Sequence, residues 1–220
     1  MNTMVIAPHP DDEVLGVGGT LLRRKSEGAK IAWLIVTSMN SEFGWCSDKI
    51  KQRSDEIRLI SKLFGFDSVY ELNFPTTRLD QVAMCDLVAA ISNAFNSFEP
   101  EEIFLPHPSD VHTDHKIVFE AVSSCAKWFR HPSVKRILTY ETISETDFGL
   151  VQNQSFCPNV FIDIQPFLKG KLGAMDVYKS EMGSAPFPRS AEVIQALSTI
   201  RGAASGFESA EAFELLRERL

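Results

Sequence analysis

Short apolar runs alternate along the chain with longer segments in which apolar side chains recur at helical spacing. The short runs predict strands at residues 3–7, 31–36, 68–72, 102–105, 136–140 and 159–163. The longer segments predict helices at residues 20–27, 48–64, about 114–129 and 166–181, a long helix with Asp80 as its N-cap, and two final helices near 190–201 and 209–219. This alternation of the two patterns is typical of an α/β protein.

The apolar strands predict how such a protein is arranged. Strands without polar alternation are typical of a parallel sheet that is covered on both faces. We therefore expect an open, doubly wound, mostly parallel sheet of the Rossmann-like kind, with helices on both faces. No repeat or linker interrupts the pattern, so residues 1–220 are expected to form a single domain. In the common strand order 3-2-1-4-5, strands 1 and 4 are neighbours where the winding reverses, and ligands bind at their carboxyl ends.

Polar side chains gather directly after the first and the fourth predicted strand. One imidazole and three carboxylates follow the first strand, at His9, Asp11, Asp12 and Glu13. Three imidazoles and two carboxylates follow the fourth, at His107, Asp110, His112, Asp114 and His115. Closely packed carboxylates raise one another's pKa, and a bound divalent cation removes that cost. Because the two strand ends meet at the switch point, we expect the clusters to surround one metal ion.

The two clusters, and the glycines after the first of them, are also compatible with roles that need no metal. The first cluster resembles a solvated turn, although a turn needs one Asp or Asn rather than three acids and a His. The second resembles a helix start capped by Ser109, Asp110 or Thr113. Three glycines, Gly16, Gly18 and Gly19, resemble a dinucleotide-binding loop. That loop lacks the third glycine of GxGxxG, and the nearby acids would repel a pyrophosphate.

The donor set and the composition narrow the chemistry further. Two imidazoles and one carboxylate suit Zn²⁺, and Fe²⁺ or another divalent metal uses the same donors. The formal net charge of −7 argues against nucleic acid as a partner. No apolar run reaches the length of a transmembrane segment, and no secretion signal precedes the first strand. With four scattered cysteines and no CxxC pair, the chain is expected to be cytoplasmic, either as a monomer or as a homo-oligomer.

The two polar motifs together resemble those of a known family. The segment Ala-Pro-His-Pro-Asp-Asp-Glu at residues 7–13, with Ser-Asp-Val-His-Thr-Asp-His at residues 109–115, is similar to the PIG-L/LmbE-like deacetylases. These are zinc-dependent enzymes that remove N-acetyl groups from amino sugars such as N-acetylglucosamine conjugates. Weaker similarities extend along most of the chain, at Arg53 with Glu56, Tyr140 with Glu141, Lys171 with Tyr178, and Arg201 with residues 210–213.

The resemblance implies a role for each motif residue. It implies that His9, Asp12 and His115 bind zinc, that Asp11 is the general base, and that His112 stabilises the oxyanion, with a positive charge if it is protonated. Asp114 is expected to orient an imidazole, and Arg53 to contact sugar hydroxyls or a phosphate. Strand alternation alone would place His9 and Asp11 on one face, so a ligand at Asp12 requires a turn beyond Pro10. Some relatives carry a Tyr where this chain has Asp110, which leaves open what else polarises the substrate carbonyl.

Two alternatives to a sugar deacetylase stay open. The same sheet suits a catalytically silent metal-binding protein, and the same site suits an amidase that acts on a non-sugar amide. The identity of the N-acetyl sugar conjugate is not readable from these motifs. We expect two loops to decide it, because binding residues are concentrated on loops. They are residues 37–47, which are long enough to act as a lid, and residues 142–158.

Overall fold

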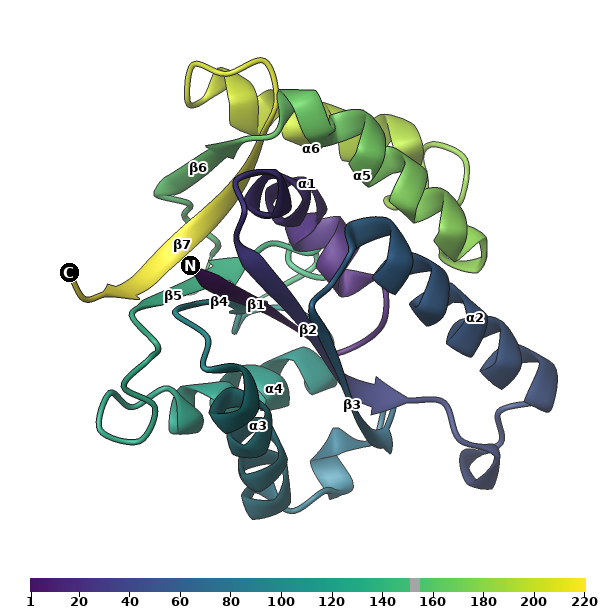
Figure 1. Ribbon diagram of the computed structural model, residues 1–220. Helices are drawn as coiled ribbons and strands as arrows, with labels where there is room; N and C mark the ends of the chain where they lie inside the picture. Colours follow the sequence, from purple (N-terminus) through teal and green to yellow (C-terminus); the bar gives the residue numbers. More distant parts are fainter. Residues whose placement is uncertain (151–154) are drawn as a thin grey trace.

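The computed structural model describes residues 1–150 and 155–220, and its centre is a seven-stranded sheet in the order β3-β2-β1-β4-β5-β7-β6 (Figure 1). The strands are β1 (Asn2–Ala7), β2 (Lys30–Ser38), β3 (Ser68–Pro75), β4 (Glu102–Pro106), β5 (Arg136–Tyr140), β6 (Val160–Asp163) and β7 (Ala210–Glu218). The first five pair in parallel, and β7 is antiparallel to both of its neighbours. The prediction of a mostly parallel α/β sheet is confirmed.

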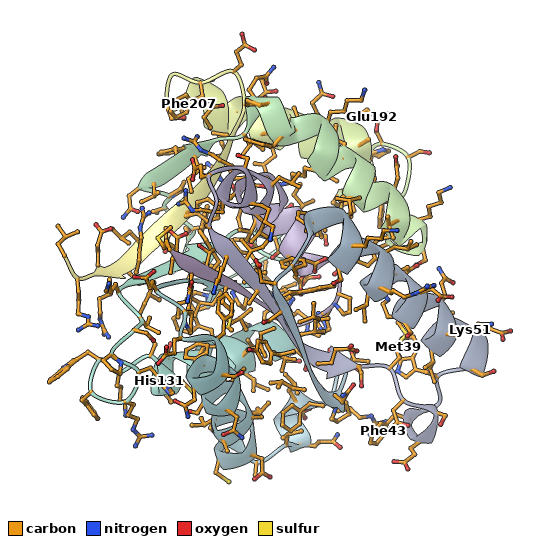
Figure 2. The ribbon with its side chains drawn as sticks, viewed as in Figure 1. Met39, Phe43, Lys51, His131, Glu192 and Phe207 are labelled. Carbon is orange, nitrogen blue, oxygen red and sulfur yellow. The ribbon has the colours of Figure 1, made fainter. Side chains whose placement is uncertain are left out.

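Helices cover both faces of this sheet, and side chains fill the space beneath them (Figure 2). The α-helices are α1 (Asp12–Ser26), α2 (Ser47–Phe64), α3 (Met84–Phe98), α4 (Thr113–Cys125), α5 (Leu168–Met175) and α6 (Ala191–Ala203). Alternation along β1 separates the two cores. Val5 packs with α1, α2, α5 and α6, whereas Met4 and Ile6 pack with α3 and α4. In the described residues, no helix has both the length and the apolar character needed to cross a membrane.

Four predicted helices have other bounds or another structure. The helix expected at residues 20–27 is the C-terminal part of α1, which already begins at Asp12. Asp80 does not cap α3; it lies in a short 3₁₀ turn, Leu79–Gln81, and Ala83 precedes the helix. The helix expected to reach residue 129 ends at Cys125. The segment expected to be helical over 166–181 is α5 flanked by 3₁₀ turns at Gln165–Phe167 and Asp176–Glu181. These last three helices are shorter than their apolar patterns suggest, whereas α1 is longer.

The predicted helix at residues 209–219 is wrong, because this segment is the strand β7. Ala, Glu and Leu give it a high helix propensity. The final conformation is set by tertiary pairing instead, since β7 lies between β5 and β6 and bonds to both. Its first four residues are buried, and Glu211 among them meets a buried partner, Lys171.

The glycines of α1 allow close packing. A Cβ at Gly16 would overlap the Tyr140 ring, and one at Gly19 would lie 2.7 Å from Ile164. The glycines therefore let α1 pack closely against its neighbours. This packing explains why they are glycines, and no dinucleotide-binding role is needed.

The strand order places the two polar motifs side by side. β1 bonds to β2 on one side and to β4 on the other, with Val5 opposite Phe104. The predicted order of the first five strands is therefore confirmed. The segments that follow Ala7 and Pro106 leave the same edge of the sheet at the switch point.

Candidate metal centre and active site

A tight turn after β1 brings the first motif together. The Asp12 amide donates to the His9 carbonyl at 3.4 Å, and the His9 amide donates to Asp12 Oδ2 at 2.9 Å. Asp11, between them, has a φ of 133°, which is unusual for a residue other than glycine. The chain does turn beyond Pro10, as a ligand at Asp12 requires. Asp12 then begins α1 with its carboxylate close to the His9 ring.

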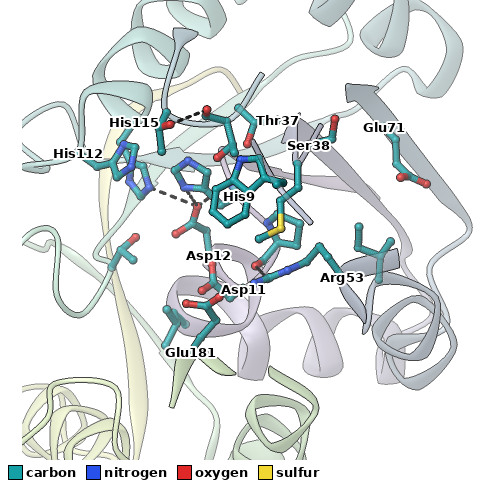
Figure 3. A pocket seen from close by; sticks show the side chains of 18 of the residues that line it. His9, Asp11, Asp12, Thr37, Ser38, Arg53, Glu71, His112, His115 and Glu181 are labelled. Atoms are coloured by element: carbon teal, nitrogen blue, oxygen red, sulfur yellow. Dashed lines mark hydrogen bonds and ion pairs between the residues drawn. The ribbon is translucent and has the colours of Figure 1, made fainter. Parts of the chain in front are cut away.

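The second motif forms the N-terminus of α4. His112 is the N-cap, and its Nδ1 accepts a hydrogen bond from the Asp114 amide at 3.1 Å. His115 lies one turn into the helix and is buried. The helix is therefore capped by the imidazole of His112 and not by the expected Ser109, Asp110 or Thr113. The helix start aims both His112 and His115 at the first motif (Figure 3).

Three side-chain atoms from the two motifs converge on one point. Oδ2 of Asp12 lies 3.5 Å from His9 Nδ1 and 3.3 Å from His115 Nε2. These atoms lie within 4.8 Å of one another, so one cation can contact all three. Two nitrogens and one carboxylate oxygen suit zinc or iron(II) and leave further coordination positions open.

The outer nitrogen of each of these imidazoles is held by a carboxylate. His9 Nε2 lies 3.0 Å from Asp114 Oδ2, and His115 Nδ1 lies 2.8 Å from Asp110 Oδ2. A proton on each outer nitrogen leaves the inner one with a free lone pair for a cation. This second set of partners fits a metal centre better than a chance group of polar residues.

Asp110 has a role that sequence reasoning missed. The sequence places it in the second polar cluster, as one of the candidate helix caps and at the position where some relatives carry a Tyr. Its carboxylate instead binds His115 and accepts from the Thr146 hydroxyl at 2.7 Å. The available signal is the position of Asp110 as the first of two acids that follow the buried strand β4. Its partner is not identifiable from sequence, because five positions separate it from His115 across an irregular segment.

A second group of donors, His9, His112 and Asp114, is also compact. It fits a cation less well, because the oxygens of Asp114 already accept hydrogen bonds from protein groups. Besides His9, they accept from the Thr77 amide at 2.7 Å and the Leu79 amide at 3.2 Å. Asp114 therefore acts as an anchor for the imidazole of His9.

The electrostatics of the first group also favour a cation. Burial opposes ionisation of Asp12, yet His115 and His9 hold its pKa well below the usual range. Burial likewise opposes protonation of His9, but its contacts with Asp114 and Asp12 raise its pKa to about 9. Burial also opposes protonation of His115, but Asp12 and Asp110 raise its pKa well above the usual range, so without a metal both imidazoles are positively charged around one carboxylate. A divalent cation replaces those protons when it binds.

Asp11 lies beside this group in a different environment. Burial and the charge of Asp12 raise its pKa to about 7, although Arg189 opposes the increase. Arg189 Nη1 donates to Asp11 Oδ2 at 3.0 Å and lies 3.3 Å from Glu181. Sequence reasoning missed Arg189, because its segment indicates only a break between helices. A carboxyl group with a pKa near neutrality can both accept and return a proton.

These groups line a cavity of about 400 Å³. Its floor carries both polar motifs, and its walls come from α2, from the C-terminal parts of β2 and β3, and from the loops after β2, β3 and β5. The wall residues include Ser38, Met39, Trp45, Ile50, Arg53, Ile57, Glu71, Asn73, Thr142, Ser144 and Glu145. Both loops expected to contact substrate, residues 37–47 and 142–158, contribute side chains to the wall of the cavity. Residues 151–154 of the second loop lie outside the described residues.

Arg53 lines the cavity but is already engaged with the protein. Its guanidinium donates to the Pro10 carbonyl and to Glu181, and Nε lies 3.2 Å from Glu56. These bonds connect α2 to the turn that carries Asp11. The predicted contact with a sugar stays a prediction, and a structural role for Arg53 is visible.

Comparisons with known proteins agree with this geometry. Residues 4–126 match the family model PIG-L, described as GlcNAc-PI de-N-acetylase. The chain is 30% identical to an uncharacterized deacetylase, YaiS, of Escherichia coli, over 80% of this chain and 90% of that protein. It is 25% identical to a diacetylchitobiose deacetylase of Thermococcus kodakarensis, over 94% and 80%. The crystal structure of the conserved protein TT1542 from Thermus thermophilus covers 99% of this chain and 96% of its own, with 26% identity and a TM-score of 0.78. The match of both motifs within residues 4–126 shows that this chain belongs to the PIG-L family of deacetylases.

Proposed function

We propose that the chain removes the N-acetyl group from an amino-sugar conjugate and that His9, Asp12 and His115 hold the divalent cation it needs. The observation that carries the proposal is the convergence of two carboxylate-backed imidazoles on one oxygen of Asp12. When bound there, a divalent cation supplies Lewis acidity, which polarises a carbonyl group and makes a water molecule more acidic.

Asp11 is the proposed general base. It lines the cavity next to Asp12, and burial and Asp12 raise its pKa to about 7 in the metal-free site. A cation bound beside it lowers that pKa and so favours the carboxylate, the form that accepts a proton. In the reaction, a water oxygen adds to the acetamide carbonyl carbon while Asp11 takes the water proton. The C–N bond then breaks, and Asp11 returns the proton to the departing nitrogen. The second hydrogen of the water stays on the new carboxyl group, so the products are acetic acid and the amine, which ionise in solution to acetate and an ammonium ion, and atoms and charge balance.

His112 is the proposed donor to the oxyanion, and it acts without a positive charge. Its Nδ1 accepts from the Asp114 amide, so the ring proton lies on Nε2. Without a cation, burial and the charges of His9 and His115 lower its pKa to about 4, and a bound cation would take over the part of those two charges, so the ring stays neutral in both cases. A neutral Nε2–H still donates a hydrogen bond to the tetrahedral oxyanion, and loss of such a donor typically lowers turnover by about 10²–10³-fold.

The cavity walls support a sugar as the substrate. A volume of about 400 Å³ lies within the range of small-molecule sites. Polar groups at Ser38, Glu71 and Asn73 can bind hydroxyls, and Trp45 offers an indole face against which a sugar ring can pack. The mixture of an indole and scattered polar groups fits a carbohydrate better than a purely apolar amide.

The test is acetate release from matched N-acetyl compounds by chain reconstituted with Zn²⁺ or Fe²⁺. We expect acetate from N-acetylglucosamine glycosides and none from N-acetyl amino acids of similar size. Acetate from the amino acids alone would favour the non-sugar amidase. Metal binding without acetate from any compound would favour a silent metal-binding protein.

A further inference from the structure

A second hollow of about 410 Å³ opens directly beside the active-site cavity. Trp45, Thr76 and Thr77 line both, so the two share a wall. The Thr77 amide donates to Asp114 Oδ2, which anchors His9, so this wall is continuous with the candidate metal centre. A group that projects from a sugar in the first cavity has a direct path into the second.

Two cations line this outer hollow, and each lies over an aromatic ring. Arg78 Cζ is 4.9 Å from the centre of the Phe43 ring, and Lys49 Nζ is 5.8 Å from that of Trp45. Phe43 lies on the connection between β2 and α2, where Figure 2 labels it, and this connection lines one side of the hollow. An aromatic face holds a guanidinium in place and leaves its N–H groups free to donate.

Neither cation has an ion-pair partner among the residues that the structure describes, because no carboxylate there lies within ion-pair distance of Lys49 or Arg78. The arginines of the inner cavity differ, because Arg53 contacts Glu56 and Glu181, and Arg189 contacts Asp11. Two positive charges held in a concave surface attract anions, and they do so here in a chain whose net charge is −7.

We propose that the outer hollow is an anion subsite, in which Lys49 and Arg78 bind a phosphate or carboxylate on the part of the substrate beyond the acetylated sugar. The inference rests on the proposed deacetylase function and narrows it to anionic amino-sugar conjugates. Phosphate and carboxylate share the chemistry that recognises them, namely charge-assisted hydrogen bonds from a guanidinium and an ammonium.

The test compares three substrates with the same acetylated sugar: N-acetylglucosamine 1-phosphate, a glycoside with a carboxylate in its aglycone, and the neutral methyl glycoside. The variants are Lys49→Gln and Arg78→Gln, with Lys51→Gln as the matched control. Lys51 is exposed on the same helix and does not line either cavity. Acetate release gives kcat and KM for each combination.

We expect the wild-type chain to prefer an anionic substrate through KM. Lys49→Gln or Arg78→Gln should raise KM for that substrate by about 10- to 100-fold, since a hydrogen bond to a charged group has this strength. The neutral glycoside and the Lys51→Gln variant should be unaffected. The substrate with the lower KM, the phosphate or the carboxylate, shows which anionic group the subsite recognises. Added salt should weaken the preference, because the charges are exposed to solvent.

Direct binding separates failure of this inference from failure of the proposed function. Calorimetric titration of the Asp11→Asn variant with the same compounds measures the anion preference without turnover. If no sugar is deacetylated but the anionic compounds still bind through Lys49 and Arg78, the subsite stands and the proposed reaction is wrong. Equal affinity and equal KM for charged and neutral compounds, with acetate released from both, would overturn the subsite and leave the reaction in place.

Discussion

The backbone at Asp11 shows how the proposed base is placed. A φ of 133° is sparsely populated for Asp, and such conformations typically cost about 1–3 kcal/mol. Glu13 holds the strained residue, because its carboxyl group accepts from the Asp11 amide at 3.0 Å and from the Tyr178 hydroxyl at 2.8 Å. The same turn presents Asp12 to the imidazoles. One local conformation therefore separates the roles of two adjacent aspartates.

The Asp11→Asn variant should separate chemistry from metal binding. Asn is nearly the same size and tolerates the same backbone, but it does not accept the water proton. We expect turnover to fall by about 10²–10⁴-fold while the metal content per chain stays unchanged. Asp80→Asn, at an exposed position outside the cavity, is the matched control. Acetate release by Asp11→Asn at the wild-type rate would show that another group is the base.

Asp110 should be needed for metal affinity, although it is not itself a proposed ligand. Asp110→Ala removes the acceptor that orients His115 Nδ1, and loss of such a partner typically weakens metal binding by about 10- to 100-fold. Asp110→Asn keeps an oxygen acceptor, so it should retain more affinity. Competition with a chromophoric chelator measures both. Equal affinity for wild type and Asp110→Ala would assign the Asp110 contact a structural role only.

At the scale of elements, a buried ion pair ties α1 to α5 and β7. Lys171 Nζ contacts Glu211 Oε1 at 2.7 Å and donates to the Leu15 carbonyl at 2.8 Å, while Glu211 accepts from the Gly19 and Thr20 amides. The Leu15 carbonyl and the Gly19 amide are partners in a regular helix, and here each bonds to the ion pair. The helix that begins at the metal motif is thereby fixed to the C-terminal strand.

Removal of one member of this pair should destabilise the fold strongly. Lys171→Met leaves the carboxylate of Glu211 buried without its cation, which typically costs about 3–5 kcal/mol. The control is Lys25→Met, which breaks a more exposed pair with Asp67 and should cost about 0–1 kcal/mol. Urea unfolding at fixed metal concentration gives both values. A similar small cost for both variants would contradict this role for the Lys171 pair.

Elements differ in how far the sequence predicts them. The first five strands and their order follow from apolar runs and topology, because parallel strands with helical crossovers allow few arrangements. The strand β7 is not recognisable from the sequence, because its Ala, Glu and Leu residues favour a helix. Only its pairing with β5 and β6 makes it a strand.

The site residues differ in the same way. Asp12 is assigned by resemblance, and the turn that brings it to His9 depends on an unusual backbone at Asp11. Arg189 reaches Asp11 from 178 positions away, so no local pattern indicates it.

At the scale of the whole molecule, the proposed metal centre joins segments that are far apart in sequence. His9 and Asp12 follow β1, whereas His115 belongs to α4 (Figure 1). A cation that binds all three binds only the folded chain and so stabilises the fold. The expected single domain, cytoplasmic location and homo-oligomer are not tested by this architecture and stay predictions.

Chelation should therefore lower the thermal stability of the wild-type chain. A metal whose free concentration is about 100 times its Kd adds about 2.7 kcal/mol to the free energy of unfolding. For a chain of this size, that free energy corresponds to a decrease in Tm of about 5–10 °C when the metal is removed. Differential scanning fluorimetry with and without chelator measures the shift. His115→Ala should show no shift, and an equal shift in that variant would place the metal elsewhere.

The most direct test of the proposed metal centre is the metal content of purified wild-type and His115→Ala chains, measured together with acetate release from an N-acetylglucosamine glycoside. We predict one divalent ion per wild-type chain, almost none in His115→Ala, and activity that returns in proportion to metal added back to the chelated wild type. Full activity of the metal-free wild type, or a full complement of metal in His115→Ala, would contradict the proposal that His9, Asp12 and His115 form one catalytic metal site.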